Sequence, residues 1–98
     1  MFYDRQGNQI SSNEFTKLHD NNYKRVLEAT LPDGKWISTV WLGVNHQFDN
    51  GPILIFETMV FSSRGNFSEE LDMERYSTEE DAIIGHYRMI EKWSNSYA

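Results

Sequence analysis

Glu57 is the residue whose position in the sequence most needs a chemical explanation. It interrupts the apolar run 53–61, so its carboxylate is expected on the same side of a strand as several large apolar side chains. Burying a lone charge is costly, so such a carboxylate needs an ion pair or hydrogen bonds, or its pKa rises. Two explanations stay open: a structural pair with Arg25, Arg75 or a Trp N–H group, and a role in ligand binding or catalysis.

The three histidines are candidates for ligand or metal binding, but their spacing matches no metal motif. His19 is expected at a helix end, His46 in the loop 45–52 and His86 on a helix face. The chain has no cysteine, which excludes thiolate ligands and thiolate nucleophiles. We therefore expect no metal site and no cofactor, and we consider His46 the best of the three for a ligand contact.

Patterns typical of catalysis are absent from the sequence. It has no nucleophile elbow around a serine, no glycine-rich phosphate loop and no Walker pattern. We therefore expect a binding protein and not an enzyme.

Acidic residues gather in the second half of the chain. Seven of the fifteen lie between residues 69 and 81: Glu69, Glu70, Asp72, Glu74, Glu79, Glu80 and Asp81. Such a run is typical of a solvated face that leads into a helix. The alternative is a surface that mimics nucleic acid and occupies a basic groove on another protein, where complementary charge speeds association.

The overall charge and hydropathy restrict the partners. A net charge of −6 argues against direct binding to nucleic acid and to anionic membranes, which both require clustered cations. No apolar run is long enough to span a bilayer, and residues 1–20 lack the apolar segment of a signal peptide. We expect a cytoplasmic protein.

Two helices are predicted from capping-box spacing, in which Ser precedes Glu by three residues. The two pairs are Ser11 with Glu14 and Ser77 with Glu80. The first predicts a helix from about Ser12 to His19, and the second a helix that ends at Trp93 or Ser94. In the second helix, five residues that recur at three- and four-residue steps, four of them apolar, define one face that must lie on a sheet. They are Ala82, His86, Met89, Ile90 and Trp93.

Strands are predicted from β-branched and aromatic residues between turn signals. The turn residues Pro32-Asp33-Gly34 indicate a hairpin between the two strands that flank them. Residues 2–10 should form a ribbon of two short strands around Gln6-Gly7-Asn8. The longer strands are expected at residues 23–31, 35–44, 53–61 and 71–76.

Together these elements predict one α+β domain over residues 1–98. It has an antiparallel sheet of about four to five strands, with a short N-terminal helix and a longer C-terminal helix packed mainly on one face. The central strands 36–44 and 53–61 are apolar on both faces, so the face without the long helix also needs a cover. Either the first helix, the loops and the ribbon cover it, or it is the interface of a homodimer or another partner.

Several segments of the chain form a recognisable motif string: Leu31–Gly43, Ile55–Phe61, Glu74–Glu80, Gly85-His86 and Glu91–Trp93. Together they resemble a family of small uncharacterised proteins encoded by bacteriophages and prophages. The resemblance spans residues 3–93. It implies a genomic context, without an activity or functional residues.

That context implies an accessory protein that acts by stoichiometric binding and inhibits a component of bacterial host defence. The component is either a protein effector such as a CRISPR enzyme, docked by the acidic segment or the second sheet face, or a nucleotide signal. A nucleotide would be held in a pocket lined by Trp36 or Trp41 and reached by Arg or Lys. The alternative is a minor virion or assembly protein.

Overall fold

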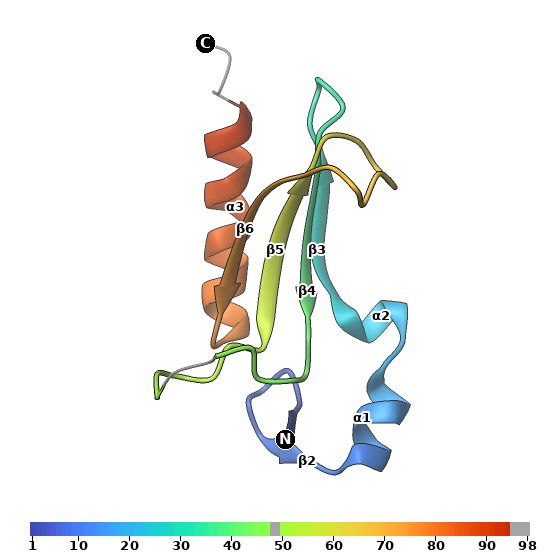
Figure 1. The fold of residues 1–98 in the computed structure, drawn as a ribbon, viewed down its shortest axis with the longest axis vertical. Helices are drawn as coiled ribbons and strands as arrows, with labels where there is room; N and C mark the ends of the chain where they lie inside the picture. Colours follow the sequence, from blue (N-terminus) through green and yellow to red (C-terminus); the bar gives the residue numbers. More distant parts are fainter. Residues whose placement is uncertain (48–49, 95–98) are drawn as a thin grey trace.

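The computed structural model describes residues 1–47 and 50–94, and it has the α+β architecture expected from the sequence (Figure 1). The elements are β1 (Phe2–Tyr3), β2 (Gln9–Ile10), α1 (Ser12–Leu18), α2 (Asn21–Lys24), β3 (Arg25–Thr30), β4 (Trp36–Trp41), β5 (Phe56–Phe61), β6 (Glu70–Tyr76) and α3 (Glu79–Ser94). The main sheet has four antiparallel strands in the order β3-β4-β5-β6, and β1 pairs with β2 in a separate ribbon. The long helix α3 packs against all four strands of the main sheet.

The predicted hairpin around Pro32-Asp33-Gly34 is confirmed, and it joins β3 to β4. The Gly34 N–H donates a hydrogen bond to the Leu31 carbonyl at 2.9 Å, and Gly34 has φ of +97°. Residues other than glycine rarely adopt that conformation. The turn sets the register in which Thr30 pairs with Trp36.

The predicted lengths of the two central strands are wrong at their shared end. β4 stops at Trp41 instead of Val44, and β5 starts at Phe56 instead of Ile53. Gly43 has φ of +75°, which is incompatible with a regular strand. Residues 45–47 and 50–52 of the loop have no regular secondary structure, and residues 48 and 49 lie outside the described residues.

Long-range hydrogen bonds hold the backbone beyond these strand ends. The N–H of Tyr3 donates to the Gly43 carbonyl at 2.9 Å, so the N-terminal ribbon binds the chain just after β4. The Asn45 side-chain oxygen accepts from the Leu54 N–H at 2.8 Å. These bonds satisfy backbone groups where the regular strand pairing has ended.

β3 starts two residues later than predicted, at Arg25. The sequence predicts a strand from Tyr23, but residues 21–24 form the short helix α2. Asp20 caps α2, since its carboxylate accepts a hydrogen bond from the Tyr23 N–H at 2.9 Å. A second short helix therefore follows α1 almost directly.

The long helix α3 has the buried face that its periodicity predicts. Ala82, Gly85, His86 and Met89 are buried, and Ile90 and Trp93 pack at the edge of the core. The N-cap is Thr78, one residue later than the expected Ser77. The Thr78 hydroxyl accepts a hydrogen bond from the Asp81 N–H in the first turn of the helix, at 3.1 Å. The periodicity of the apolar residues is therefore a better guide to α3 than its capping pair.

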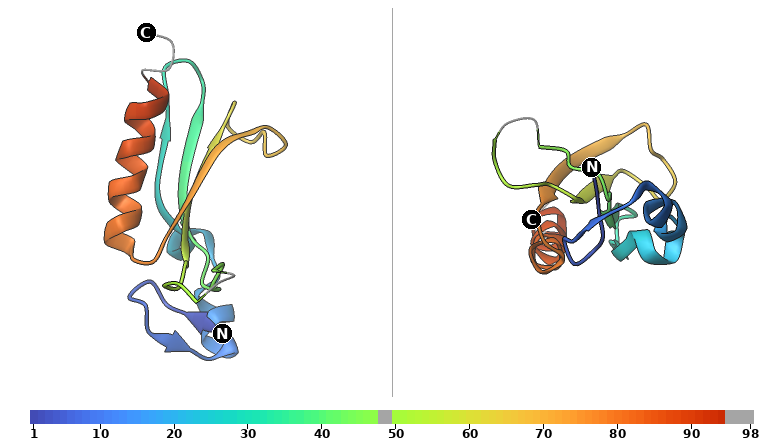
Figure 2. Two further views of the ribbon diagram at one scale, coloured as in Figure 1. Left: turned by 60° about the vertical axis from the view of Figure 1, so that its left-hand side comes forward. Right: turned by 90° about the horizontal axis from the view of Figure 1, so that it is seen from below.

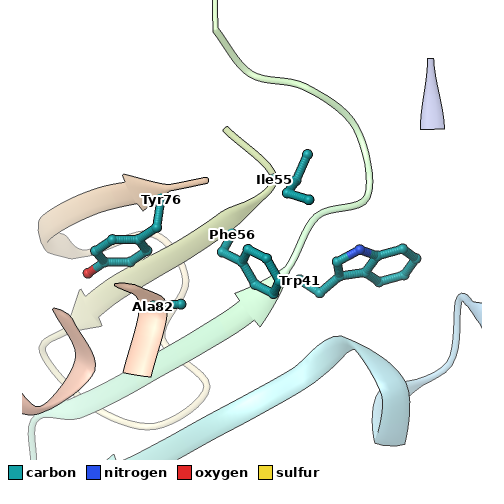
Figure 3. Packing of buried hydrophobic residues seen from close by; sticks show 5 residues of the cluster. All are labelled: Trp41, Ile55, Phe56, Tyr76 and Ala82. Atoms are coloured by element: carbon teal, nitrogen blue, oxygen red, sulfur yellow. The ribbon is translucent and has the colours of Figure 1, made fainter. Parts of the chain in front are cut away.

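The core lies between α3 and the sheet and continues beyond the end of the sheet. Figure 3 shows Phe56 and Tyr76 on neighbouring strands beside Ala82 of α3, with Trp41 at the end of β4. A second apolar cluster, formed by Leu31, Ile37, Val60 and Met89, fills the other half of the core.

The ribbon, α1 and α2 gather at one end of the sheet, around Trp41 (Figure 1). The Phe15 ring of α1 lies 5.6 Å from that of Trp41, and Tyr23 of α2 meets Trp41 edge-on at 4.8 Å. The Trp41 N–H donates to the Tyr3 carbonyl at 3.0 Å. The idea that α1 and the ribbon cover the second face of the sheet is therefore wrong, since they pack at its end.

Among the described residues, none of the helices combines the length and the apolar character needed to cross a bilayer.

Candidate binding face and pocket

The sheet has two faces, and strand register assigns each side chain to one of them. Residues paired across antiparallel strands lie on the same face. The face opposite α3, here called the second face, carries Arg25, Glu28, Thr30, Trp36, Ser38, Val40, Glu57, Met59, Phe61, Glu70, Met73 and Arg75. The loop 62–69 extends on the side of the sheet away from α3 (Figure 2).

A pocket of about 240 Å³ opens on the second face. Its residues come from α2, from β3 and β4, and from the loop 62–69. They are Asn21, Lys24, Arg25, Trp36, Ser38, Val40 and Phe67. Among the described residues, two cations and no carboxylate line this pocket, although the whole chain has a net charge of −6.

An aromatic cluster forms one wall of the pocket. Trp36 stacks on Phe61 with ring centroids 5.5 Å apart, and Phe67 meets both rings edge-on, at 5.8 and 5.3 Å. Phe67 remains 67% exposed, whereas Trp36 is only 8% exposed. The Trp36 N–H is buried and meets no hydrogen-bond acceptor among the described residues, a situation that costs free energy.

Charged side chains surround the same wall. The Glu28 carboxylate pairs with Arg64 at 3.2 Å and with Arg25 at 3.4 Å. The Arg64 guanidinium also lies over the Trp36 ring, 5.2 Å from its centroid. Glu28 therefore holds two arginines beside the pocket.

Glu57 has one of the structural partners that the sequence offers. Its carboxylate accepts a hydrogen bond from Arg75 Nε at 3.0 Å, and the two residues are paired directly across β5 and β6. Glu57 is buried and Arg75 half-buried. The structural explanation for Glu57 is thus supported, and neither residue lines the pocket.

Trp41 and His46 do not join Trp36 at the pocket. Trp41 is 1% exposed and lies on the α3 face, because five positions separate it from Trp36 on the same strand. The His46 ring is held by its own loop through Nδ1 and the Val44 carbonyl, 2.8 Å apart. Of the binding residues that the sequence suggests, only Trp36 lines the pocket; the others are Trp41, His46, Glu57 and Arg75.

The seven acidic residues do not form one continuous surface. Three of them pair with cations from other elements: Asp72 with Lys92, Glu74 with Arg88, and Glu79 with Arg5. Of the rest, Glu69 and Glu70 lie at the start of β6 and Glu80 and Asp81 at the start of α3, which are opposite ends of a seven-residue strand. That strand separates the two ends by roughly 20 Å.

Asp72 illustrates the structural role of the paired acids. Its carboxylate accepts hydrogen bonds from Lys92 at 2.7 Å and from the Trp93 N–H at 3.0 Å. Burial alone would raise the pKa of Asp72, but the hydrogen bonds from Lys92, Trp93 and the Met73 backbone outweigh it and lower that pKa. Asp72 thereby joins β6 to the last turns of α3.

Beneath α3, three polar side chains form a buried network. The Thr39 hydroxyl lies 2.7 Å from His86 Nδ1 and 2.5 Å from the Thr58 hydroxyl. Burial lowers the pKa of His86, and burial also raises the pKa of the nearby Tyr76 phenol to about 12. The neutral imidazole therefore belongs to the core, as expected for a helix-face histidine.

Sequence reasoning missed most of the pocket. Lys24 and Asn21 are placed by α2, which was not predicted, and Phe67 lies in a loop without a periodic pattern. Ser38 could have been found, since strand alternation places it on the same face as Trp36 and Val40.

The described residues contain no group of three or more His, Asp or Glu side chains that could hold a metal ion. Comparison with protein-family models, with curated proteins and with solved structures gave no match.

Proposed function

We propose that this chain is a phage-encoded accessory protein that binds a component of bacterial host defence stoichiometrically in the host cytoplasm and thereby inhibits it. The second face of the sheet is the binding surface. The observation that supports this proposal best is the pocket beside Trp36, because it combines an exposed aromatic ring, cations and a concave shape on one face.

Exposed apolar side chains lie on this face as well as on the outer surface of α3, so the pocket and its cations, and not apolar exposure alone, distinguish the second face. Phe67 and Met73 are 67% and 39% exposed, although the sheet offers buried positions for apolar side chains. Exposed apolar side chains grouped with polar ones are typical of interaction sites.

The outer surface of α3 provides matched controls. Tyr87 and Ile83 are 59% and 37% exposed, close to the values for Phe67 and Met73, but they lie on a helix that covers the opposite face. Glu substituted at any of these four positions should leave the fold intact, since all four are already in contact with water.

The test is a plating assay in cells that carry defined defence systems and express the protein. If the proposal is right, wild type restores phage growth in at least one system, and Phe67→Glu and Met73→Glu abolish the effect. Tyr87→Glu and Ile83→Glu keep it. Equal loss in both pairs, or no restored growth in a panel that includes CRISPR and nucleotide-signalling systems, would contradict the proposal.

A homodimer would use the same surface, so self-association has to be measured separately. If two copies pair through the second face, Phe67→Glu shifts the sedimentation coefficient from dimer to monomer, while Tyr87→Glu does not. Incorporation of the chain into purified virions would instead favour the assembly role.

A further inference from the structure

We propose that the pocket beside Trp36 binds a small anion that carries a planar ring, such as a nucleotide, and that Glu28 competes with that anion for Arg25, which lines the pocket. This inference rests on the proposed function and names the ligand class of the same face.

The volume of the pocket limits the size of the ligand. At about 240 Å³ it lies below the roughly 300–1,000 Å³ of typical sites for small molecules. One ring and one phosphate group fit this space. A larger signal, such as a dinucleotide, would place only one of its units in the pocket and leave the other in solvent.

The aromatic wall provides a surface for a ring. Phe67 offers an exposed ring, and the Arg64 guanidinium, a planar cation, already lies over Trp36. A base can take the place of this guanidinium, since both stack on an indole. The tryptophan itself is costly, because its N–H is buried without an acceptor among the described residues, and a phenylalanine would avoid that cost.

The polar side of the pocket suits an anion. Lys24 and Arg25 line it, and the Ser38 hydroxyl and the Asn21 amide add hydrogen-bond donors. Both cations can form charge-assisted bonds to phosphate oxygens.

Glu28 is the internal competitor. Its carboxylate pairs with Arg25 at 3.4 Å and Arg64 at 3.2 Å, the two arginines that flank the aromatic wall. A phosphate that binds Arg25 must weaken this pair. Neutralising Glu28 should therefore strengthen anion binding, an outcome that a purely structural role of these residues would not produce.

The experiment is calorimetric titration of the full chain with adenosine 5′-monophosphate, adenosine and inorganic phosphate. We expect the monophosphate to bind more tightly than adenosine or inorganic phosphate alone. Its affinity should decrease as salt is added. Lys24→Gln and Arg25→Gln should each weaken binding about five- to tenfold, and Glu28→Gln should strengthen it about threefold.

Each variant has a control elsewhere on the molecule. Lys17→Gln on α1 matches Lys24→Gln, and Glu91→Gln on α3 matches Glu28→Gln, since both control residues are exposed. Arg88→Gln matches Arg25→Gln, because Arg88 also makes a surface ion pair of 3.4 Å. None of the three should change the affinity.

Indole N–H resonances locate the ligand independently. The Trp36 signal, assigned through its loss in Trp36→Phe, should move on titration. The Trp41 signal should stay, since that N–H is bonded to Tyr3 inside the core.

The outcomes separate this inference from the proposed function. No binding of any of the three probes at about 1 mM, or binding unchanged in Lys24→Gln, Arg25→Gln and Glu28→Gln, overturns the ligand assignment. If Phe67→Glu still abolishes the effect on host defence in that case, the proposed function stands with another target. If the monophosphate binds as expected but the protein restores no phage growth, the assignment of the pocket's ligand is supported and the proposed function is contradicted.

Discussion

The Tyr76 ring occupies the space into which a side chain at Gly85 would project. The absence of a side chain at residue 85 therefore lets α3 approach β6 closely. The nearest atoms to a Cβ at this position would be the Tyr76 hydroxyl oxygen and two carbons of its ring. Gly85 is buried, and it lies one position before His86 of the polar network.

Gly85→Ala should destabilise the protein despite the better helix propensity of alanine. The gain of about 1 kcal/mol from propensity is outweighed by overpacking of about 1–3 kcal/mol, because the ring cannot move far within the core. Urea denaturation monitored by circular dichroism measures the change. Gly85→Ala combined with Tyr76→Phe should be less destabilised than the sum of the single variants, since the hydroxyl is the nearest obstacle.

His86 should make stability depend on pH. Burial lowers its pKa in the folded state, so between that lowered value and the unfolded value of about 6.5 only the unfolded chain takes up the proton. The free energy of unfolding therefore falls as pH decreases below about 6.5, by up to about 1.4 kcal/mol per pH unit.

The check is urea denaturation of wild type and His86→Asn between pH 5 and 8. Asparagine keeps a polar atom near the position of Nδ1, so Thr39 retains a partner. The difference in stability between the two proteins should shrink as pH falls. A difference that stays constant over this range would contradict a neutral, buried imidazole.

Asp72 should stabilise the protein more than its acidic neighbours do. Asp72→Ala removes bonds to Lys92 and Trp93 and should cost about 1–2 kcal/mol, whereas Glu70→Ala, at an exposed position of the same strand, should cost at most about 0.5 kcal/mol. Because the folded-state pKa of Asp72 is lowered, its contribution is present above about pH 4 and lost as pH falls through the folded value. Thermal denaturation of both variants at pH 7 and pH 3 tests this: the difference between their stabilities should be smaller at pH 3 than at pH 7.

The parts of the fold that local patterns decide could be predicted from the sequence. The strand 36–44 is apolar on both faces as expected, with Trp36 and Trp41 on opposite sides, and the spacing from Ala82 to Trp93 defined the buried side of α3. The turn at Gly34 fixed the hairpin, because positive φ there strongly favours glycine.

The missed features depend on contacts between distant segments. Tyr3 binds the Gly43 carbonyl just beyond the end of β4, from some forty residues away, and no local pattern records that bond. The acidic residues 69–81 are continuous in the sequence but not on the surface. Arg5 pairs with Glu79 and Lys92 pairs with Asp72, and these two cations come from opposite ends of the chain. The pocket combines α2, two strands and a loop, so its composition follows from tertiary structure.

The Glu57–Arg75 pair gives the last prediction. Arg75→Gln leaves the buried Glu57 carboxylate without its cation and should destabilise the protein by about 1–3 kcal/mol, less than a fully buried pair because Arg75 is 28% exposed. Arg88→Gln breaks an exposed pair with Glu74 and should cost less than about 0.5 kcal/mol. Replacing both partners, by Glu57→Gln with Arg75→Met, should recover most of the lost stability, since no charge is then left unpaired.

Chemical denaturation of wild type, the two single variants and the double variant tests this prediction. If Arg75→Gln is no worse than Arg88→Gln, Glu57 does not depend on Arg75, and a ligand-binding role for this carboxylate becomes the better explanation.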